Sequence, residues 1–204
     1  AYGGKTILAT NTSGLSIQNM ASELGRPDRF IGIHYFQPAE IFPSVEVILV
    51  EQTTHEVVQV VTAALERNGQ NTILIKRPIP GFLVNRLQHA VLHEAFSMIE
   101  QGAVTAEDID RACKTMFGPR MCVTGLIEQK DIGGLATTAA TQRNLVPQLN
   151  HSGIPTQSLQ DMVARGELGV KSGKGFYDWS SRDVEAHKKR AMEKLRRILE
   201  ILAE

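Results

Sequence analysis

The chain has 204 residues, of which 22 are basic and 22 acidic, so its formal net charge is zero. This balance gives no overall electrostatic reason to bind nucleic acid or an anionic membrane, and 42% apolar residues exclude a disordered chain. No apolar run approaches the length of about 20 residues that spans a bilayer.

The first part of the chain alternates between strand-like and helix-like segments. Apolar runs rich in β-branched residues predict strands over 6–10, 29–36, 44–51 and 72–75. Ser16 is a candidate N-cap for a helix that ends near Gly25. Thr53 and Glu56 form a capping box that predicts a second helix, ending near Asn68. This order of elements is typical of an α/β domain with a thin sheet.

A proline-rich joint at 77–81 ends this pattern, and helical periodicity follows it. We expect helices over about 81–101, 105–117, 123–145, 156–165 and 183–202. The first and the last of them carry apolar stripes, at Leu83, Leu87, Val91, Ala95 and Met98 and at Met192, Leu195, Leu199 and Leu202. The sequence therefore predicts an α/β domain over 1–78 and an all-α domain over 79–204.

Several residue types with chemical potential have a plainer interpretation. The glycine-rich stretch 169–175 has the wrong glycine spacing for a phosphate-binding loop and follows a helix instead of a strand. His89 and His93 are one helical turn apart, but no third ligand is in view, so we expect no metal site. Cys113 and Cys122 predict no disulfide framework and are typical of a reduced, intracellular protein. The basic side chains of 183–202 alternate with glutamates, which favours a solvated face.

Polar side chains at the ends of the predicted strands are the strongest candidates for chemistry. Ser13 follows the first strand, His34 lies near the end of the second, and Glu46 lies within the third. In an open α/β sheet, ligands bind beyond the carboxyl ends of the strands. Histidine titrates near neutral pH and suits a general base, which a carboxylate can orient. Spacing alone leaves two interpretations open, a His34–Glu46 pair or two side chains with separate partners.

At these residues the sequence resembles the L-3-hydroxyacyl-CoA dehydrogenase family, which includes bacterial 3-hydroxybutyryl-CoA dehydrogenases. The stretches that carry the resemblance are ATNTSGLSI (9–17), RFIGIHYFQPAEIFPSVEVI (29–48), PGFLVNRL (80–87), GLIEQKDIGGL (125–135) and GVKSGKGFYDW (169–179). The resemblance implies the C-terminal half of a Rossmann-type NAD-binding domain, followed by a helical domain like that of 6-phosphogluconate dehydrogenase.

The resemblance also implies roles for individual residues. His34 matches the catalytic histidine that takes the proton from the 3-hydroxyl, and Glu46 matches the carboxylate paired with it. Ser13 matches a serine that contacts the reacting hydroxyl, and Asn85 matches an asparagine that completes the site. Asn11 and Ser13 match residues beside the cofactor. The implied activity is the NAD-dependent interconversion of a 3-hydroxyacyl-CoA and a 3-ketoacyl-CoA by a cytoplasmic homodimer that associates through the helical domain.

Two departures from the family pattern affect these expectations. Gln37 stands where the family commonly has Asn, and FPSVEV replaces a more usual hydrophobic spacer, so the substrate could instead be a free hydroxy acid of the gulonate or carnitine type. The chain also lacks the G-x-G-x-x-G turn that binds the pyrophosphate of NAD, and it lacks an initiator Met. We therefore expect a truncated form with impaired NAD binding. For such a form, a non-catalytic helical dimerisation module is the alternative.

Overall fold

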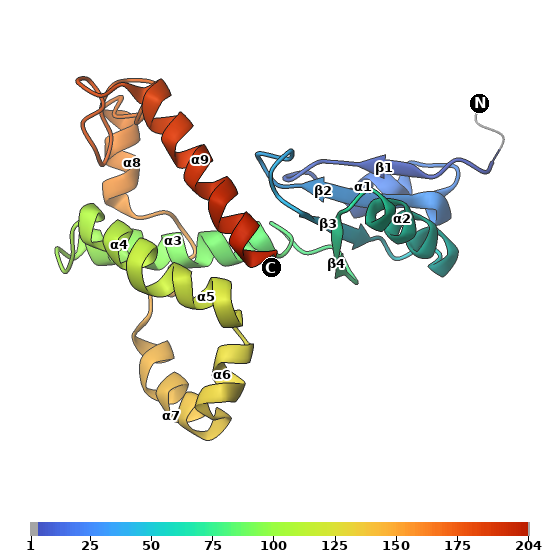
Figure 1. Ribbon diagram of the computed structural model, residues 1–204, viewed down its shortest axis with the longest axis horizontal. Coiled ribbons are helices and arrows are strands. Elements are labelled where there is room, and N and C mark those ends of the chain that lie inside the picture. The colour runs from blue at the N-terminus through green and yellow to red at the C-terminus, as the bar shows by residue number, and fades with distance from the viewer. Residues whose placement is uncertain (1–3, 204) are drawn as a thin grey trace. The chain divides into compact units, whose positions relative to one another are not determined.

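The computed structural model describes residues 4–203 (Figure 1). The chain divides after His89 into two compact units, the first with the strands and the second with most of the helices. The first is called the sheet unit and the second, 90–204, the helical unit. None of the described helices is long and apolar enough to cross a membrane.

The sheet unit is built on a four-stranded mixed sheet with the strand order β1-β2-β3-β4. Its strands are β1 (Leu8–Thr10), β2 (Phe30–Tyr35), β3 (Ser44–Leu49) and β4 (Asn71–Ile75). β1 and β2 are parallel, β2 and β3 are antiparallel, and β3 and β4 are parallel. All four predicted strands are present within two residues of the expected bounds. The carboxyl ends of β1 and β2 therefore lie at one edge of the sheet.

Three helical segments connect these strands: α1 (Ile17–Ser22), the 3₁₀ turn η1 (Pro27–Arg29) and α2 (His55–Arg67). The predicted cap of α1 is confirmed, because Ser16 Oγ accepts a hydrogen bond from the N–H of Asn19 at 3.2 Å. The predicted capping box of α2 is wrong by one residue, since Thr54 is the N-cap. Thr53 is occupied elsewhere: its hydroxyl accepts from the N–H of Val50 and donates to the carbonyl of Phe30.

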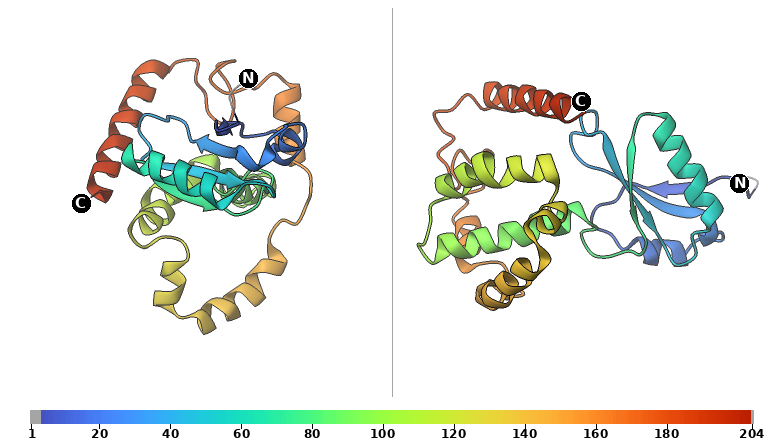
Figure 2. Two further views of the ribbon diagram at one scale, coloured as in Figure 1. Left: turned by 90° about the vertical axis from the view of Figure 1, so that its right-hand side faces the viewer. Right: turned by 60° about the horizontal axis from the view of Figure 1, so that its bottom comes forward.

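Alternate residues of the strands supply two apolar clusters, as expected when a sheet is covered on both faces. The cluster that includes α1 consists of Ile17, Ala21, Phe30, Ile48, Val50, Ile75 and Phe82. The cluster that includes α2 consists of Ile31, Val45, Val47, Val57, Val61 and Leu65. The right-hand view of Figure 2 shows both helices alongside the sheet, α1 in blue and α2 in teal.

The segment that leaves the sheet unit forms α3 (Val84–Glu100), and eight helical segments follow it. They are α4 (Ala106–Ala112), the π-helix η2 (Cys113–Phe117), α5 (Gly118–Thr124), α6 (Glu128–Gly133), α7 (Leu135–Leu145), the 3₁₀ turn η3 (Val146–Gln148), α8 (Gln157–Ala164) and α9 (Val184–Leu202). The continuous helix expected over 123–145 is wrong. Gly125 at φ +66° and Gly134 at φ +90° take left-handed conformations that interrupt it.

Carboxylates of α3 hold returning segments of the helical unit. Glu94 Oε2 accepts a hydrogen bond from the N–H of Asn150, and Glu100 Oε1 accepts one from the N–H of Ser158 in the first turn of α8, both at 2.7 Å. The glycine-rich stretch 169–175 is a turn in which two parts of the backbone approach each other closely. A Cβ on Gly175 would lie 2.9 Å from the Cα of Gly169, so this stretch has a structural use for its glycines.

Candidate active site

His34 and Glu46 are directly opposite each other on the antiparallel strands β2 and β3. Side chains at such a pair project from the same face of the sheet. The Nδ1 of His34 lies 2.6 Å from Oε2 of Glu46, and the two side chains are 6% and 3% exposed. Of the two interpretations that the sequence left open, the structure therefore shows the pair. The catalytic role of the two residues stays a prediction.

The second oxygen of Glu46 is bound by the start of α3. Oε1 accepts hydrogen bonds from the N–H groups of Leu83 at 3.0 Å and of Val84 at 2.9 Å. The first N–H groups of a helix have no partner within the helix and carry partial positive charge, so they stabilise an anionic carboxylate. Burying a charge is costly unless it is paired and hydrogen-bonded, and here both oxygens of Glu46 have such partners.

The imidazole of His34 lies near two aromatic rings. The ring of Phe82 lies 5.3 Å from it at a tilt of 60°, and the ring of Phe36 lies 6.0 Å from it, edge to face. While Nδ1 faces Glu46, Nε2 makes no hydrogen bond to any other residue in the described part of the chain. A histidine with one nitrogen held by a carboxylate and the other free can take a proton from a ligand and stabilise the resulting cation.

Asn11 and Ser13 lie just beyond the end of β1, on the edge of the sheet where β2 also ends. Asn11 Oδ1 accepts a hydrogen bond from the N–H of Tyr35 at 2.9 Å, so this side chain fastens the residue next to His34. Ser13 is exposed, and its hydroxyl makes no hydrogen bond to another described residue. Asn85 is half-buried in the first turn of α3, directly after the two N–H groups that bind Glu46.

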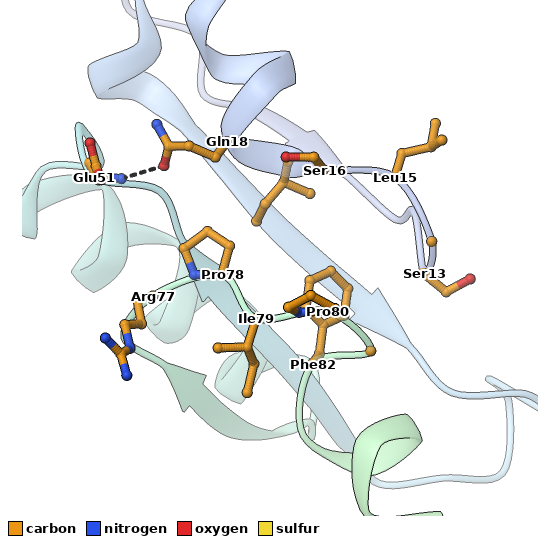
Figure 3. A pocket seen from close by; sticks show the side chains of 13 residues that line it. Ser13, Leu15, Ser16, Gln18, Glu51, Arg77, Pro78, Ile79, Pro80 and Phe82 are labelled. Atoms are coloured by element: carbon orange, nitrogen blue, oxygen red, sulfur yellow. Dashed lines mark hydrogen bonds between the residues drawn. The ribbon is translucent and has the colours of Figure 1, made fainter. Parts of the chain in front are cut away.

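A hollow of about 390 Å³ adjoins this site, between the start of α1 and the segment 77–82 (Figure 3). Ser13 and Phe82 lie toward one end of it, and Glu51 and Arg77 lie toward the other (Figure 3). Its remaining lining residues are Gly14, Leu15, Ser16, Ile17, Gln18, Pro78, Ile79, Pro80 and Gly81. The hollow offers a mostly apolar floor beside the exposed hydroxyl of Ser13.

These positions fit one end of a dinucleotide better than a metal ion. The described residues contain no group of three or more His, Cys, Asp or Glu side chains that could hold a metal. The edge that carries Asn11, Ser13 and His34 is where open α/β sheets bind such cofactors. Ser13, with its free hydroxyl, and His34, with its unpaired Nε2, both lie toward this edge of the sheet.

The residues that surround the His34–Glu46 pair were not predicted from the sequence. Phe36 and Phe82 were not assigned to the site, nor were the N–H groups of Leu83 and Val84. A signal for the second group was present, because Pro80-Gly81 before an apolar helical stretch predicts a turn that starts a helix. Nothing in the spacing indicated that the turn would point its N–H groups at a carboxylate on β3.

Two family models match the chain. The model described as the 3-hydroxyacyl-CoA dehydrogenase NAD-binding domain matches residues 2–78, and the one described as the 3-hydroxyacyl-CoA dehydrogenase C-terminal domain matches residues 81–179. The four strands are therefore part of a Rossmann-like NAD-binding domain, followed by the helical C-terminal domain. The fold expected from the sequence resemblance is confirmed.

Individual relatives agree with this match. A 5-formyl-3-hydroxy-2-methylpyridine 4-carboxylate 5-dehydrogenase of Mesorhizobium japonicum is 28% identical over 201 residues, which cover 97% of this chain and 65% of that protein. The mitochondrial hydroxyacyl-coenzyme A dehydrogenase of Mus musculus is 37% identical over 177 residues, which cover 85% of this chain and 55% of that protein. This chain thus spans between about half and two thirds of the length of these relatives.

Solved structures give the same result. The crystal structure of a 5-formyl-3-hydroxy-2-methylpyridine 4-carboxylic acid 5-dehydrogenase, described as an NAD+-dependent dismutase, superposes with a TM-score of 0.94 at 27% identity, covering 98% of this chain and 65% of that chain. A 3-hydroxyacyl-CoA dehydrogenase from Archaeoglobus fulgidus superposes with a TM-score of 0.64 at 32% identity, covering 98% of this chain and 68% of that chain. With residues 2–78 and 81–179 matched by the two domain models, the chain belongs to the 3-hydroxyacyl-CoA dehydrogenase family.

Proposed function

We propose that the protein is an NAD-dependent oxidoreductase that interconverts a 3-hydroxyacyl-CoA and a 3-ketoacyl-CoA, with His34 as general acid and base. The observation that carries this proposal is the buried His34–Glu46 pair, 2.6 Å apart, with Nε2 of His34 left without a protein partner. A base must reach the proton that it abstracts, and Nε2 is the nitrogen available for that contact.

In the oxidation, Nε2 of His34 accepts the proton of the 3-hydroxyl group, and the C3 carbon becomes a carbonyl. NAD, when bound, supplies the acceptor for the hydride that leaves C3. Glu46 holds Nδ1–H and stabilises the imidazolium that forms. Ser13 donates a hydrogen bond to the reacting oxygen, and Asn85 adds an amide from α3. In the reduction, His34 returns the proton to the oxygen.

A second candidate substrate is a small free acid without CoA. The match to the pyridine-carboxylate dehydrogenase covers 97% of this chain, which takes in most of α9, whereas the C-terminal family model ends at residue 179. Gln37, three residues after His34, is a further departure from the family pattern, which commonly has Asn at this position. The same proton and hydride chemistry applies to a hydroxy acid of the gulonate or carnitine type.

We propose that the protein acts as a cytoplasmic homodimer that associates through the helical unit. Large apolar side chains of this unit are exposed within one chain, among them Val123, Ile127 and Ile132. Covering such side chains with a second copy removes apolar surface from water. Cys113 and Cys122 are both free, as is usual in the cytoplasm.

The test is turnover of His34→Gln in the protein as its gene encodes it, with acetoacetyl-CoA or a free oxo acid and NADH. We expect kcat to fall about 10²- to 10⁴-fold, because general acid–base catalysis contributes about that much. The Kd of NADH should stay the same, since His34 acts on the substrate. His89→Gln is the control, because His89 is exposed on α3 and touches none of these groups.

Three outcomes separate the candidates. Turnover of the CoA ester alone supports the first substrate, and turnover of a free acid alone supports the second. A dimer that neither binds NADH nor turns over either substrate would support the non-catalytic module and overturn the oxidoreductase. Unchanged kcat in His34→Gln would remove His34 from the role of the base.

A further inference from the structure

The turn that precedes α3 contains an unusual residue. Phe82 has φ +47°, and it is the sole non-glycine residue with positive φ among residues 4–203. This left-handed conformation brings a Cβ close to the backbone, so side chains other than that of glycine adopt it at a cost. Strained residues of this kind persist where the surrounding structure requires them, and they cluster at functional sites.

The neighbouring residues account for the strain only in part. Pro80 and Gly81, with φ +75°, form a turn that is closed by a 3.0 Å hydrogen bond from the N–H of Phe82 to the carbonyl of Ile79. Proline followed by glycine is the usual pair for such a turn, and it accommodates the positive φ of Gly81. It does not require that the next residue also be left-handed. The reason must lie in what Phe82 and its successors contact.

Phe82 is connected to both members of the His34–Glu46 pair. Phe82 is 4% exposed, and the centre of its ring lies 5.3 Å from that of the imidazole of His34. The two residues after it, Leu83 and Val84, point their N–H groups at Oε1 of Glu46. Phe82 therefore supplies a ring beside His34. Its backbone also directs the N–H groups of the next two residues toward Glu46 (Figure 3 shows the turn).

We propose that Phe82 is a positioning residue for the His34–Glu46 pair, and this proposal rests on the function proposed above. Its left-handed backbone aims the N–H groups of Leu83 and Val84 at Glu46, and its ring packs against the imidazole. With Oε1 bound by the turn, Oε2 is left to hold Nδ1 of His34. Nε2 is then kept in one direction, toward the substrate, before any ligand binds.

Four variants separate the two parts of this role. Phe82→Ala and Phe82→Gly both delete the ring, but glycine tolerates positive φ and alanine does not, so their difference reports the backbone. Phe82→Leu keeps apolar bulk while it removes the ring. Phe30→Leu is the matched control, because Phe30 belongs to the same apolar cluster and makes no ring contact with His34.

The first measurement is proton NMR of the 204-residue chain with ¹⁵N-labelled histidine. A proton shared over 2.6 Å between Nδ1 of His34 and Glu46 gives a far-downfield resonance. We expect this resonance to be lost in Phe82→Ala, weakened in Phe82→Gly and Phe82→Leu, and unchanged in Phe30→Leu. Far-UV circular dichroism establishes that each variant is folded, and Phe82→Leu keeps the test decisive where Phe82→Ala fails to fold.

The second measurement is turnover in the protein as its gene encodes it. We expect kcat to fall about 10- to 100-fold in Phe82→Ala and less in Phe82→Gly, because small misplacements of a catalytic group are costly. In a His34→Gln background, Phe82→Ala should cause no further loss, since the two residues act as a unit. A purely structural role would instead add its loss to that of His34→Gln.

The two proposals fail in different ways. A resonance that is the same in all Phe82 variants, together with a large loss of turnover in His34→Gln, overturns the positioning role and leaves the proposed function. A resonance that responds to Phe82 as expected, together with unchanged turnover in His34→Gln, supports the positioning role and overturns the proposed function.

Discussion

The sheet unit and the helical unit bury their apolar side chains very differently. Thirteen of the buried apolar residues lie in the sheet unit, whereas Ala95 alone represents the described part of the helical unit. The sheet unit thus has a core of its own on each face of the sheet. The helices of the other unit leave residues such as Ile127 and Ile132 more than two thirds exposed.

Both units nevertheless cap the start of one helix in the same way. A glutamate from another element accepts hydrogen bonds from the first N–H groups: Glu46 at α3 and Glu100 at α8. Glu46 is buried and also holds His34, whereas Glu100 is exposed. Burial and a second partner therefore fix the direction of the Glu46 carboxylate, whereas Glu100 is a solvent-exposed helix cap.

Replacing each of these carboxylates by alanine is expected to give the largest difference in unfolding free energy between the units. Glu46→Ala leaves His34 and the N–H groups of Leu83 and Val84 without their buried partner, so we expect a loss of about 3–5 kcal/mol in unfolding free energy. Glu100→Ala removes an exposed cap, for which we expect about 0.5–2 kcal/mol. Urea unfolding gives the totals, and hydrogen exchange assigns the loss to β2 and β3 or to α8. Equal losses would mean that burial does not distinguish the two carboxylates.

Truncating an apolar side chain tests the two cores directly. Ile48 is fully buried in the cluster beneath α1, so Ile48→Ala should cost about 2–5 kcal/mol. Ile127 is 73% exposed, so Ile127→Ala should stay within about 0.5 kcal/mol in a dilute, monomeric sample. A large, concentration-dependent loss for Ile127→Ala, measured by thermal unfolding, would contradict an open surface and indicate that a second copy covers it.

The same contrast explains which parts of the fold the sequence could predict. The four strands were predictable from their apolar, β-branched runs, and in β2 and β3 these runs reflect burial on both faces. The start of α1 was also predictable, from Ser16. The breaks at Gly125 and Gly134 were not, since an isolated glycine within a helical pattern is usually tolerated. In the helical unit, periodicity is weakly tied to burial, so it located the helices but not their breaks.

The site was predictable as a set of residues but not as a geometry. The resemblance pointed to His34 and Glu46, yet their contact depends on the strand register, which the connection between β2 and β3 sets. The conformation of Phe82 was not predictable, because its positive φ runs against the steric preference of every residue with a Cβ. Such exceptions to local rules are expected at functional sites, where tertiary contacts override them.

Two glycines, one in each unit, differ in how closely their neighbours pack. A Cβ on Gly32 in β2 would lie 3.1 Å from Cβ of Ile48 and 3.3 Å from Cδ1 of Ile17, so Gly32→Ala should cost about 1–3 kcal/mol through overpacking. A Cβ on Gly133, at the end of α6, would meet nothing within 4 Å. Gly133→Ala should therefore stabilise the helical unit by about 0.4–1 kcal/mol, because alanine restricts the unfolded chain. Thermal unfolding of both variants checks the opposite signs.

A comparison that depends on pH concerns a tyrosine in each unit. Tyr177 donates a hydrogen bond to Asp110 at 3.1 Å, and burial, with this hydrogen bond as the next cause, raises the pKa of Tyr177. A raised pKa means that the folded state binds the phenol proton more tightly, so the contribution is present below the unfolded pKa of about 10 and is lost as the pH rises through the folded value.

Tyr177→Phe should therefore cost about 0.5–1.5 kcal/mol near neutral pH and less at a pH above about 10. Tyr35→Phe in β2 is the matched control, because the Tyr35 hydroxyl has no hydrogen-bond partner among residues 4–203. Urea unfolding at pH values from neutral to alkaline measures both variants. A Tyr177→Phe effect of the same size at alkaline pH would contradict this assignment, because the deprotonated oxygen can no longer donate a hydrogen bond to Asp110.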